Sequence, residues 1–124
     1  MMFEIYVVED DQDVSESMRE TLEDAGFRVT QAADAQTALA RLQGGYRPAA
    51  MIVDVMLPQM TGTELLRLCR EDPALADIPA VVVSSTTPVG LDDRQARFVA
   101  KPFTVDQLLD ALLACFDEAA ASAG

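Results

Sequence analysis

Short apolar runs alternate with amphipathic segments along the chain. Glu4 to Val8, Ala49 to Asp54 and Ala80 to Ser85 are nearly continuous apolar runs of strand length. Such runs are typical of strands that are buried on both faces of a parallel sheet. Phe27 to Ala32 alternates enough to predict a strand near the sheet edge, and Phe98 to Ala100 predicts a short fifth strand.

Capping residues mark where the helices between these strands begin. The first helix is predicted to start at Asp13, with Glu16 three residues later, and to end at Gly26. Asp34 is predicted to cap the second helix, which the two glycines Gly44 and Gly45 terminate. Two further capping pairs predict the remaining clear helices: Thr61 with Glu64, and Thr104 with Gln107.

The segment from Thr86 to Arg97 has the weakest pattern. Pro88 and Gly90 interrupt it, so that only a short helix near Leu91–Ala96 is predicted. No repeat or low-complexity linker divides the chain. We therefore predict one domain over residues 1 to 118, followed by a frayed tail over residues 119 to 124.

Strands that alternate with helices predict an α/β fold with a parallel sheet. Five such units suit a doubly wound, flavodoxin-like sheet of strand order 2-1-3-4-5, here with a short or irregular fourth helix. In that topology the carboxyl ends of four strands converge on one crevice. The polar residues at these ends are Glu9 and Asp10, Asp54, Ser84, and Lys101.

Composition fits a globular protein. The chain has 124 residues, of which 50% are hydrophobic, and no apolar run approaches the length of a membrane span. No secretory signal is recognised near the amino terminus. Cys69 and Cys115 lie within helical apolar patterns and lack metal-ligand spacing, so we expect reduced core cysteines in a cytoplasmic protein.

The charge balance bears on possible partners and chemistry. The 21 acidic and 9 basic residues give a net charge of −12, and no Lys/Arg cluster occurs, so direct nucleic-acid binding is not expected. The chain contains 0 histidines, which excludes Ser-His-Asp and Cys-His catalysis within it. Any histidine phosphodonor must therefore belong to another protein.

Carboxylates that crowd together repel one another, and a hard divalent cation such as Mg²⁺ relieves that conflict. A site of this kind would combine the carboxylates of Glu9, Asp10 and Asp54 with the ammonium of Lys101 and the hydroxyl of Ser84. Such a set suits a transferring phosphoryl group, whose charge needs metal and ammonium partners. Asp54 would then act as the nucleophile and form an aspartyl phosphate.

The motifs at these strand ends resemble those of response regulator receiver domains, over the chain from about Phe3 to Asp117. The matching stretches are Val7-Val8-Glu9-Asp10-Asp11, Ile52-Val53-Asp54-Val55-Met56-Leu57-Pro58-Gln59-Met60-Thr61-Gly62, and Lys101-Pro102-Phe103. Ser84 stands at the family's Ser/Thr position and Phe98 at its aromatic switch position. Each motif is common alone, but their order along the chain makes the resemblance specific.

The resemblance implies a phosphorylation site that uses Mg²⁺. Asp54 would accept a phosphoryl group from a histidine kinase or a histidine phosphotransfer protein. Glu9 and Asp10 would help to bind Mg²⁺, with Asp10 as the more direct ligand, and Met56 would contribute its backbone carbonyl. Such a domain assists its own phosphotransfer and dephosphorylation and is not otherwise an enzyme.

The resemblance also implies a switch. Ser84 and Lys101 would hold the phosphoryl oxygens, and Ser84 would shift toward the phosphate while Phe98 turns inward. The surface around the fourth helix, fifth strand and last helix would change, and a downstream protein target would read that change. Phe98 is equally compatible with ordinary core packing.

Departures from the family pattern leave other functions open. The chain from Ser84 to Lys101 is several residues shorter than usual, and a Gly-Ala-Asp turn before the fifth strand is missing. A receiver-like module that binds partners without being phosphorylated is therefore the main alternative. A flavin or nucleotide binder would need a phosphate cradle in place of Glu9-Asp10-Asp11, and a phosphatase or nuclease would favour an aspartate at Met56.

Overall fold

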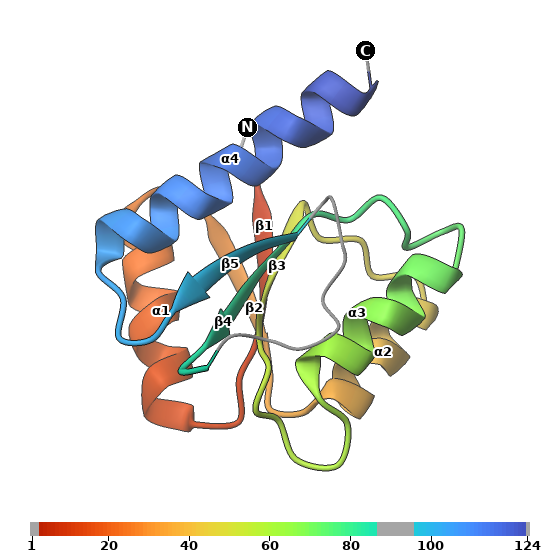
Figure 1. The fold of residues 1–124 in the computed structure, drawn as a ribbon, viewed down its shortest axis with the longest axis horizontal. Coiled ribbons are helices and arrows are strands. Elements are labelled where there is room, and N and C mark those ends of the chain that lie inside the picture. The colour runs from red at the N-terminus through yellow and green to blue at the C-terminus, as the bar shows by residue number, and fades with distance from the viewer. Residues whose placement is uncertain (1–2, 87–95, 124) are drawn as a thin grey trace.

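The fold, seen in a computed structural model, is a parallel sheet between two layers of helices (Figure 1). The structure describes residues 3–86 and 96–123. Within these ranges it contains the following strands and helices: β1 (Glu4–Val8), α1 (Gln12–Asp24), β2 (Arg28–Ala32), α2 (Ala35–Gln43), β3 (Ala50–Asp54), α3 (Gly62–Glu71), β4 (Ala80–Ser84), β5 (Ala96–Ala100) and α4 (Val105–Ala123).

The strand order is β2-β1-β3-β4-β5 with all neighbours parallel, which confirms the predicted doubly wound sheet. The register brings the carboxyl ends of the strands to one edge. Val8 pairs with Val53, and on the next strand Asp54 pairs with Val83. Residues that follow these positions therefore meet at the same edge of the sheet.

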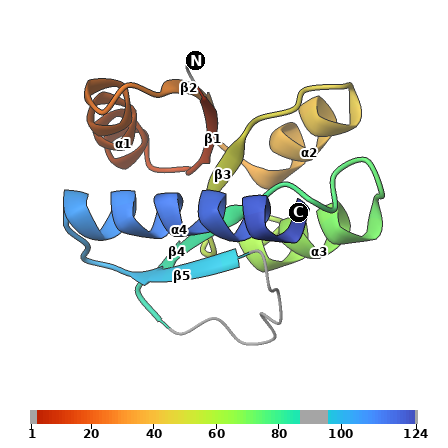
Figure 2. The same ribbon diagram turned by 90° about the horizontal axis from the view of Figure 1, so that it is seen from above.

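The core has two layers, one on each face of the sheet. Figure 2 shows α1 and α4 on one face and α2 and α3 on the other. Alternate residues of each strand enter different layers, because successive side chains of a strand point to opposite faces. In β1, Ile5 and Val7 pack with the α1/α4 layer, whereas Tyr6 and Val8 pack with the α2/α3 layer.

The two cysteines fall in different layers. Cys69 is buried on the α2/α3 side, and Cys115 is buried on the α1/α4 side. The Cys115 thiol donates to the carbonyl of Ala80 at 3.3 Å. No disulfide joins the two residues, in agreement with the prediction of reduced core cysteines.

One predicted cap is wrong. The N-cap of α1 is Asp11, whose side chain accepts the backbone N–H groups of Asp13 and Val14 at 3.0 and 3.2 Å. Asp13 lies inside the first turn of the helix. The prediction fails because Asp11 and Asp13 both offer a carboxylate that could cap the helix. The helix begins after Asp11, the earlier of the two.

The other predicted helix starts are confirmed. Asp34, Thr61 and Thr104 each accept a backbone N–H three residues later. Gln107 Oε1 also accepts the Thr104 N–H at 2.9 Å, so that this pair forms a complete capping box.

The carboxyl-terminal third of the chain differs from prediction at its boundaries. β5 starts at Ala96, earlier than predicted, and α4 runs from Val105 to Ala123, which includes most of the predicted tail. The predicted short helix lies outside the described residues except for Ala96, which belongs to β5. None of the helices in the described part of the chain is long and apolar enough to cross a membrane.

Candidate functional site

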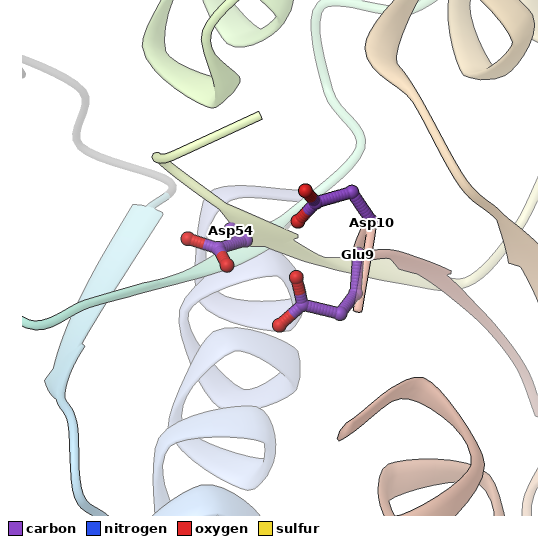
Figure 3. A group of neighbouring side chains, drawn as sticks. All are labelled: Glu9, Asp10 and Asp54. Atoms are coloured by element: carbon purple, nitrogen blue, oxygen red, sulfur yellow. The ribbon is translucent and has the colours of Figure 1, made fainter. Parts of the chain in front are cut away.

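Three carboxylates meet at the carboxyl edge of the sheet, as the sequence predicts. Glu9 and Asp10 follow β1, and Asp54 ends β3. One carboxylate oxygen of each residue lies within 4.8 Å of the others. Figure 3 shows these three side chains gathered at the end of β3. Glu9 and Asp54 are buried, whereas Asp10 is exposed to solvent.

Lys101, which directly follows β5, completes this cluster. Its ammonium donates to Asp54 Oδ2 at 2.8 Å and to Glu9 Oε1 at 3.2 Å. The Lys101 side chain is 28% exposed, while those of Glu9 and Asp54 are 1% and 5% exposed. The ammonium therefore balances two buried carboxylates and still faces solvent. Sequence reasoning placed Lys101 near Asp54 but did not predict its second contact with Glu9.

The second oxygen of Asp54 is held by the following loop. The Met56 N–H donates to Asp54 Oδ1 at 2.9 Å, so that both carboxylate oxygens have a donor. The Met56 side chain is 66% exposed. The role of its backbone carbonyl as a metal ligand stays a prediction. The contact of its N–H with Asp54 forms an Asx-type turn. An aspartate just before a turn in the sequence could have predicted it.

Gly62 fixes where α3 begins relative to Asp54. Its N–H donates to the carbonyl of Val55 at 3.1 Å. A Cβ atom on Gly62 would collide with the backbone carbonyl of Asp54 and would lie 2.8 Å from a methyl group of Val53. Glycine is therefore required here because only it lets the helix start directly against the end of β3.

The pKa values of the two buried carboxylates shift in opposite directions. Burial, together with the neighbouring Asp54, raises the pKa of Glu9 to about 7, although Lys101 opposes this. Burial also acts to raise the pKa of Asp54, but hydrogen bonds from the Glu9 carboxyl group, Lys101 and the Met56 N–H outweigh it and lower that pKa. The surroundings therefore favour the ionised form of Asp54 more than that of Glu9.

Lys101 remains a cation in this setting. Burial alone would lower its pKa, but its hydrogen bonds to Asp54 and Glu9 outweigh that effect and raise the pKa above its usual value. The site thus presents a permanent positive charge beside an ionised carboxylate. This arrangement can stabilise an anionic group that approaches Asp54.

Ser84 and Phe98, the remaining predicted residues, lie on β4 and β5. Ser84 is fully buried at the end of β4. Among the residues described, no hydrogen bond joins the Ser84 hydroxyl to the carboxylates or to the Lys101 ammonium. Its hydroxyl oxygen instead accepts the N–H of Thr86 at 3.1 Å, a contact that sequence reasoning missed. Phe98 is 41% exposed on β5 and is not ordinary core.

The three carboxylates fit a hard divalent cation. Mg²⁺ prefers oxygen ligands, keeps several waters, and typically takes one or two carboxylates. Glu9, Asp10 and Asp54 offer three such oxygens at close range, and the exposure of Asp10 leaves one side of the group open to water. These residues would hold the ion, which supplies additional positive charge for a phosphoryl group.

The fold and this site define a class of protein: a flavodoxin-like α/β domain whose phosphoryl-compatible site lies at the carboxyl edge of its sheet. Comparison of sequences then identifies the family. The profile of the response regulator receiver domain matches residues 5–113. The chain therefore belongs to the response regulator receiver domain family of two-component signalling proteins.

Individual relatives agree with this assignment. The chain is 35% identical over 114 residues to the response regulator MprA of Mycolicibacterium vanbaalenii, which covers 88% of this chain and 48% of MprA. It is 33% identical to the C4-dicarboxylate transport transcriptional regulatory protein DctD of Rhizobium meliloti, covering 85% of this chain and 23% of DctD. The chain thus spans at most about half the length of these relatives.

Solved structures give the same result. The chemotaxis protein CheY4 of Vibrio cholerae superimposes with a TM-score of 0.83 at 29% identity, covering 93% of this chain and 99% of that one. A CheY-like receiver domain protein of Methanospirillum hungatei gives a TM-score of 0.85 at 25% identity, covering 98% and 99%. These matches confirm the predicted family and fold.

Proposed function

We propose that this chain is a signalling switch in which Asp54 accepts a phosphoryl group in the presence of Mg²⁺. The contact of Lys101 Nζ with Asp54 Oδ2, at 2.8 Å, is the observation that carries the proposal. It sets a cation beside an ionised carboxylate at a site that also holds two acidic metal-ligand candidates. This is the charge pattern that phosphoryl transfer requires.

In the proposed reaction, an oxygen of Asp54 attacks the phosphorus atom of the donor. A P–O bond to Asp54 forms as the bond between phosphorus and the leaving group breaks, and the leaving group departs with that electron pair. Lys101 and Ser84 bind the phosphoryl oxygens. Mg²⁺, held by Glu9, Asp10, Asp54 and the Met56 carbonyl, would neutralise part of the charge.

The phosphodonor is proposed to be a histidine kinase or a histidine phosphotransfer protein. The chain has 0 histidines of its own, so the phosphohistidine must come from a partner.

The output is proposed to be a protein target that binds the face around β5 and α4, where Phe98 is exposed. With a net charge of −12, the domain is not proposed to contact nucleic acid directly, and a cytoplasmic location belongs to the same proposal.

Incorporation of phosphate tests the proposal. The protein is incubated with Mg²⁺ and acetyl phosphate, or with phosphoramidate as a small P–N donor, and intact mass is measured. We expect one phosphoryl group per chain in the wild type and none in Asp54→Asn. Asp77→Asn, which changes an exposed aspartate on the loop before β4, should behave as the wild type.

Two further measurements sharpen this test. Chelation of Mg²⁺ should stop incorporation, and Asp10→Asn should weaken Mg²⁺ binding by about tenfold or more. Because Asp10 is exposed, its substitution should leave the free energy of unfolding within about 0.5 kcal/mol of the wild type. If the wild type takes up no phosphate from either donor, the phosphorylation-independent interaction module is the correct function.

A further inference from the structure

The hydroxyl of Ser84 lies on the strand next to Asp54, but it is engaged away from the carboxylates. In the register of β3 and β4, Asp54 pairs with Val83, the residue before Ser84. The Ser84 carbonyl accepts the Lys101 N–H at 2.8 Å, which fixes the backbone between two strands. Rotation of the side chain is therefore the movement open to this buried hydroxyl.

Thr86 makes two contacts with that hydroxyl. Its backbone N–H donates to Ser84 Oγ at 3.1 Å, and its own Oγ1 lies 3.5 Å from Ser84 Oγ, where either hydroxyl can donate. Thr86 is itself exposed, so that these contacts do not fill the core. They instead join the end of β4 to the loop that follows it.

We propose that Thr86 is a positioning residue that restrains the Ser84 hydroxyl while Asp54 carries no phosphate. This inference rests on the proposed function, because it concerns the group that binds the phosphoryl oxygens. A serine hydroxyl has a single proton to donate. When Ser84 is the donor in its contact with Thr86 Oγ1, that proton cannot be donated to an oxygen on Asp54.

Phosphorylation of Asp54 would then bring about an exchange of partners. The phosphoryl oxygens are charged acceptors, and hydrogen bonds to charged groups are stronger than those between neutral hydroxyls. Ser84 would turn its proton to the phosphoryl group and release Thr86 Oγ1. The contact between Ser84 and Thr86, the residue two positions after β4 ends, would thereby depend on whether Asp54 is phosphorylated.

This inference predicts that, of two substitutions at Thr86, only the one that removes the hydroxyl changes binding. Thr86→Val removes the competing hydroxyl and keeps the branched shape, whereas Thr86→Ser keeps the hydroxyl. The exposed position accommodates both. One neutral hydrogen bond of this kind corresponds to about a threefold change in affinity for a ligand that needs the Ser84 donor.

The test uses beryllofluoride, a mimic of the phosphoryl group, with Mg²⁺ present. We expect Thr86→Val to bind beryllofluoride about threefold more tightly than the wild type, and Thr86→Ser to match the wild type. In a double-mutant cycle, the gain should disappear when Ser84→Ala is also present, because the restrained hydroxyl is then missing.

Each other outcome has a distinct meaning. If the wild type binds no beryllofluoride, the proposed function itself fails. If the wild type binds and Thr86→Val binds equally, the restraint by Thr86 is refuted while phosphorylation at Asp54 stands. A gain from Thr86→Val that persists with Ser84→Ala would also overturn the inference, since the effect would not pass through Ser84.

Discussion

Lys101 Nζ lies 2.8 Å from Asp54 Oδ2, although 47 positions separate the two residues in the sequence. The contact exists because β3, β4 and β5 are parallel neighbours and their carboxyl ends coincide. A cation and a carboxylate are thus held together by sheet topology and not by a local turn.

Replacement of Lys101 by alanine should separate metal binding from phosphoryl binding. Mg²⁺ binding should persist, because its carboxylate ligands remain. Beryllofluoride affinity should fall about 10- to 100-fold, the equivalent of one charge-assisted hydrogen bond. Calorimetric titration of each ligand measures both. Lys101→Arg, which keeps the charge with a different shape, should retain part of the affinity. Loss of Mg²⁺ binding in Lys101→Ala would indicate a wider disturbance of the site.

The stability of the metal-free protein should depend on Glu9. Its pKa in the folded protein is raised to about 7 from 4.5. A carboxyl group with a raised pKa stabilises the fold below its unfolded pKa, and that contribution is lost as the pH rises through the folded pKa. Between about pH 4.5 and about pH 7, we expect the free energy of unfolding to decline. The decline should be about 1 to 2 kcal/mol, after allowance for solvent screening.

Denaturant unfolding with a chelator present measures this dependence. The pKa of Asp54 is lowered from its ordinary value of 3.8, so its ionised form stabilises the fold above that pH. That stabilisation is lost only as the pH falls below 3.8. The two effects therefore occupy different pH ranges. Glu9→Gln should give a flatter profile over the upper range. An unchanged slope in that variant would show that another group is responsible.

Gly62→Ala should damage both the fold and the site. Its methyl group would press on the Asp54 backbone, and overpacking of this kind costs about 1 to 3 kcal/mol. We also expect slower phosphorylation by acetyl phosphate, because Asp54 must move. Gly26→Ala is the control: Gly26 has a φ of 99° but no heavy atom near an added Cβ. That variant should lose about 1 kcal/mol of stability without slower phosphorylation.

The start of α1 can be checked by a pair of substitutions. Asp11→Ala should lower the free energy of unfolding by about 1 kcal/mol, because it removes the acceptor for two backbone N–H groups. Asp13→Ala, within the first turn, should cost less, since only a favourable interaction with the helix dipole is lost. Thermal or denaturant unfolding distinguishes them. Equal losses would contradict the assignment of Asp11 as the cap.

The sequence predicts those residues of the site whose positions follow from the order of the strands in the sheet. Glu9, Asp54 and Lys101 each directly follow or end a strand, so parallel order is enough to bring them together. The caps at Asp34 and Thr61 were likewise predictable, because each stands alone as a capping residue before its helix.

Details that depend on competition between similar groups were not predictable. Asp11 and Asp13 are chemically equivalent as caps, and only the observed geometry separates them. Alternation along β5 does not reveal that Val99 is buried and Phe98 exposed, since apolar residues occupy both faces of that strand. The bond from Thr86 to Ser84 is likewise hidden, because hydroxyls at a strand end have many possible partners.

The position of Lys101 after the last strand has a consequence for the newly made chain. Ribosomes release Glu9 and Asp54 first, and the ammonium that neutralises them follows only with the end of β5. Pairing between segments far apart in sequence forms late in folding. Until β5 joins the sheet, Glu9 and Asp54 therefore lack the ammonium that contacts both of them in the fold. The proposed phosphorylation site is therefore complete only once the final strand has joined the sheet.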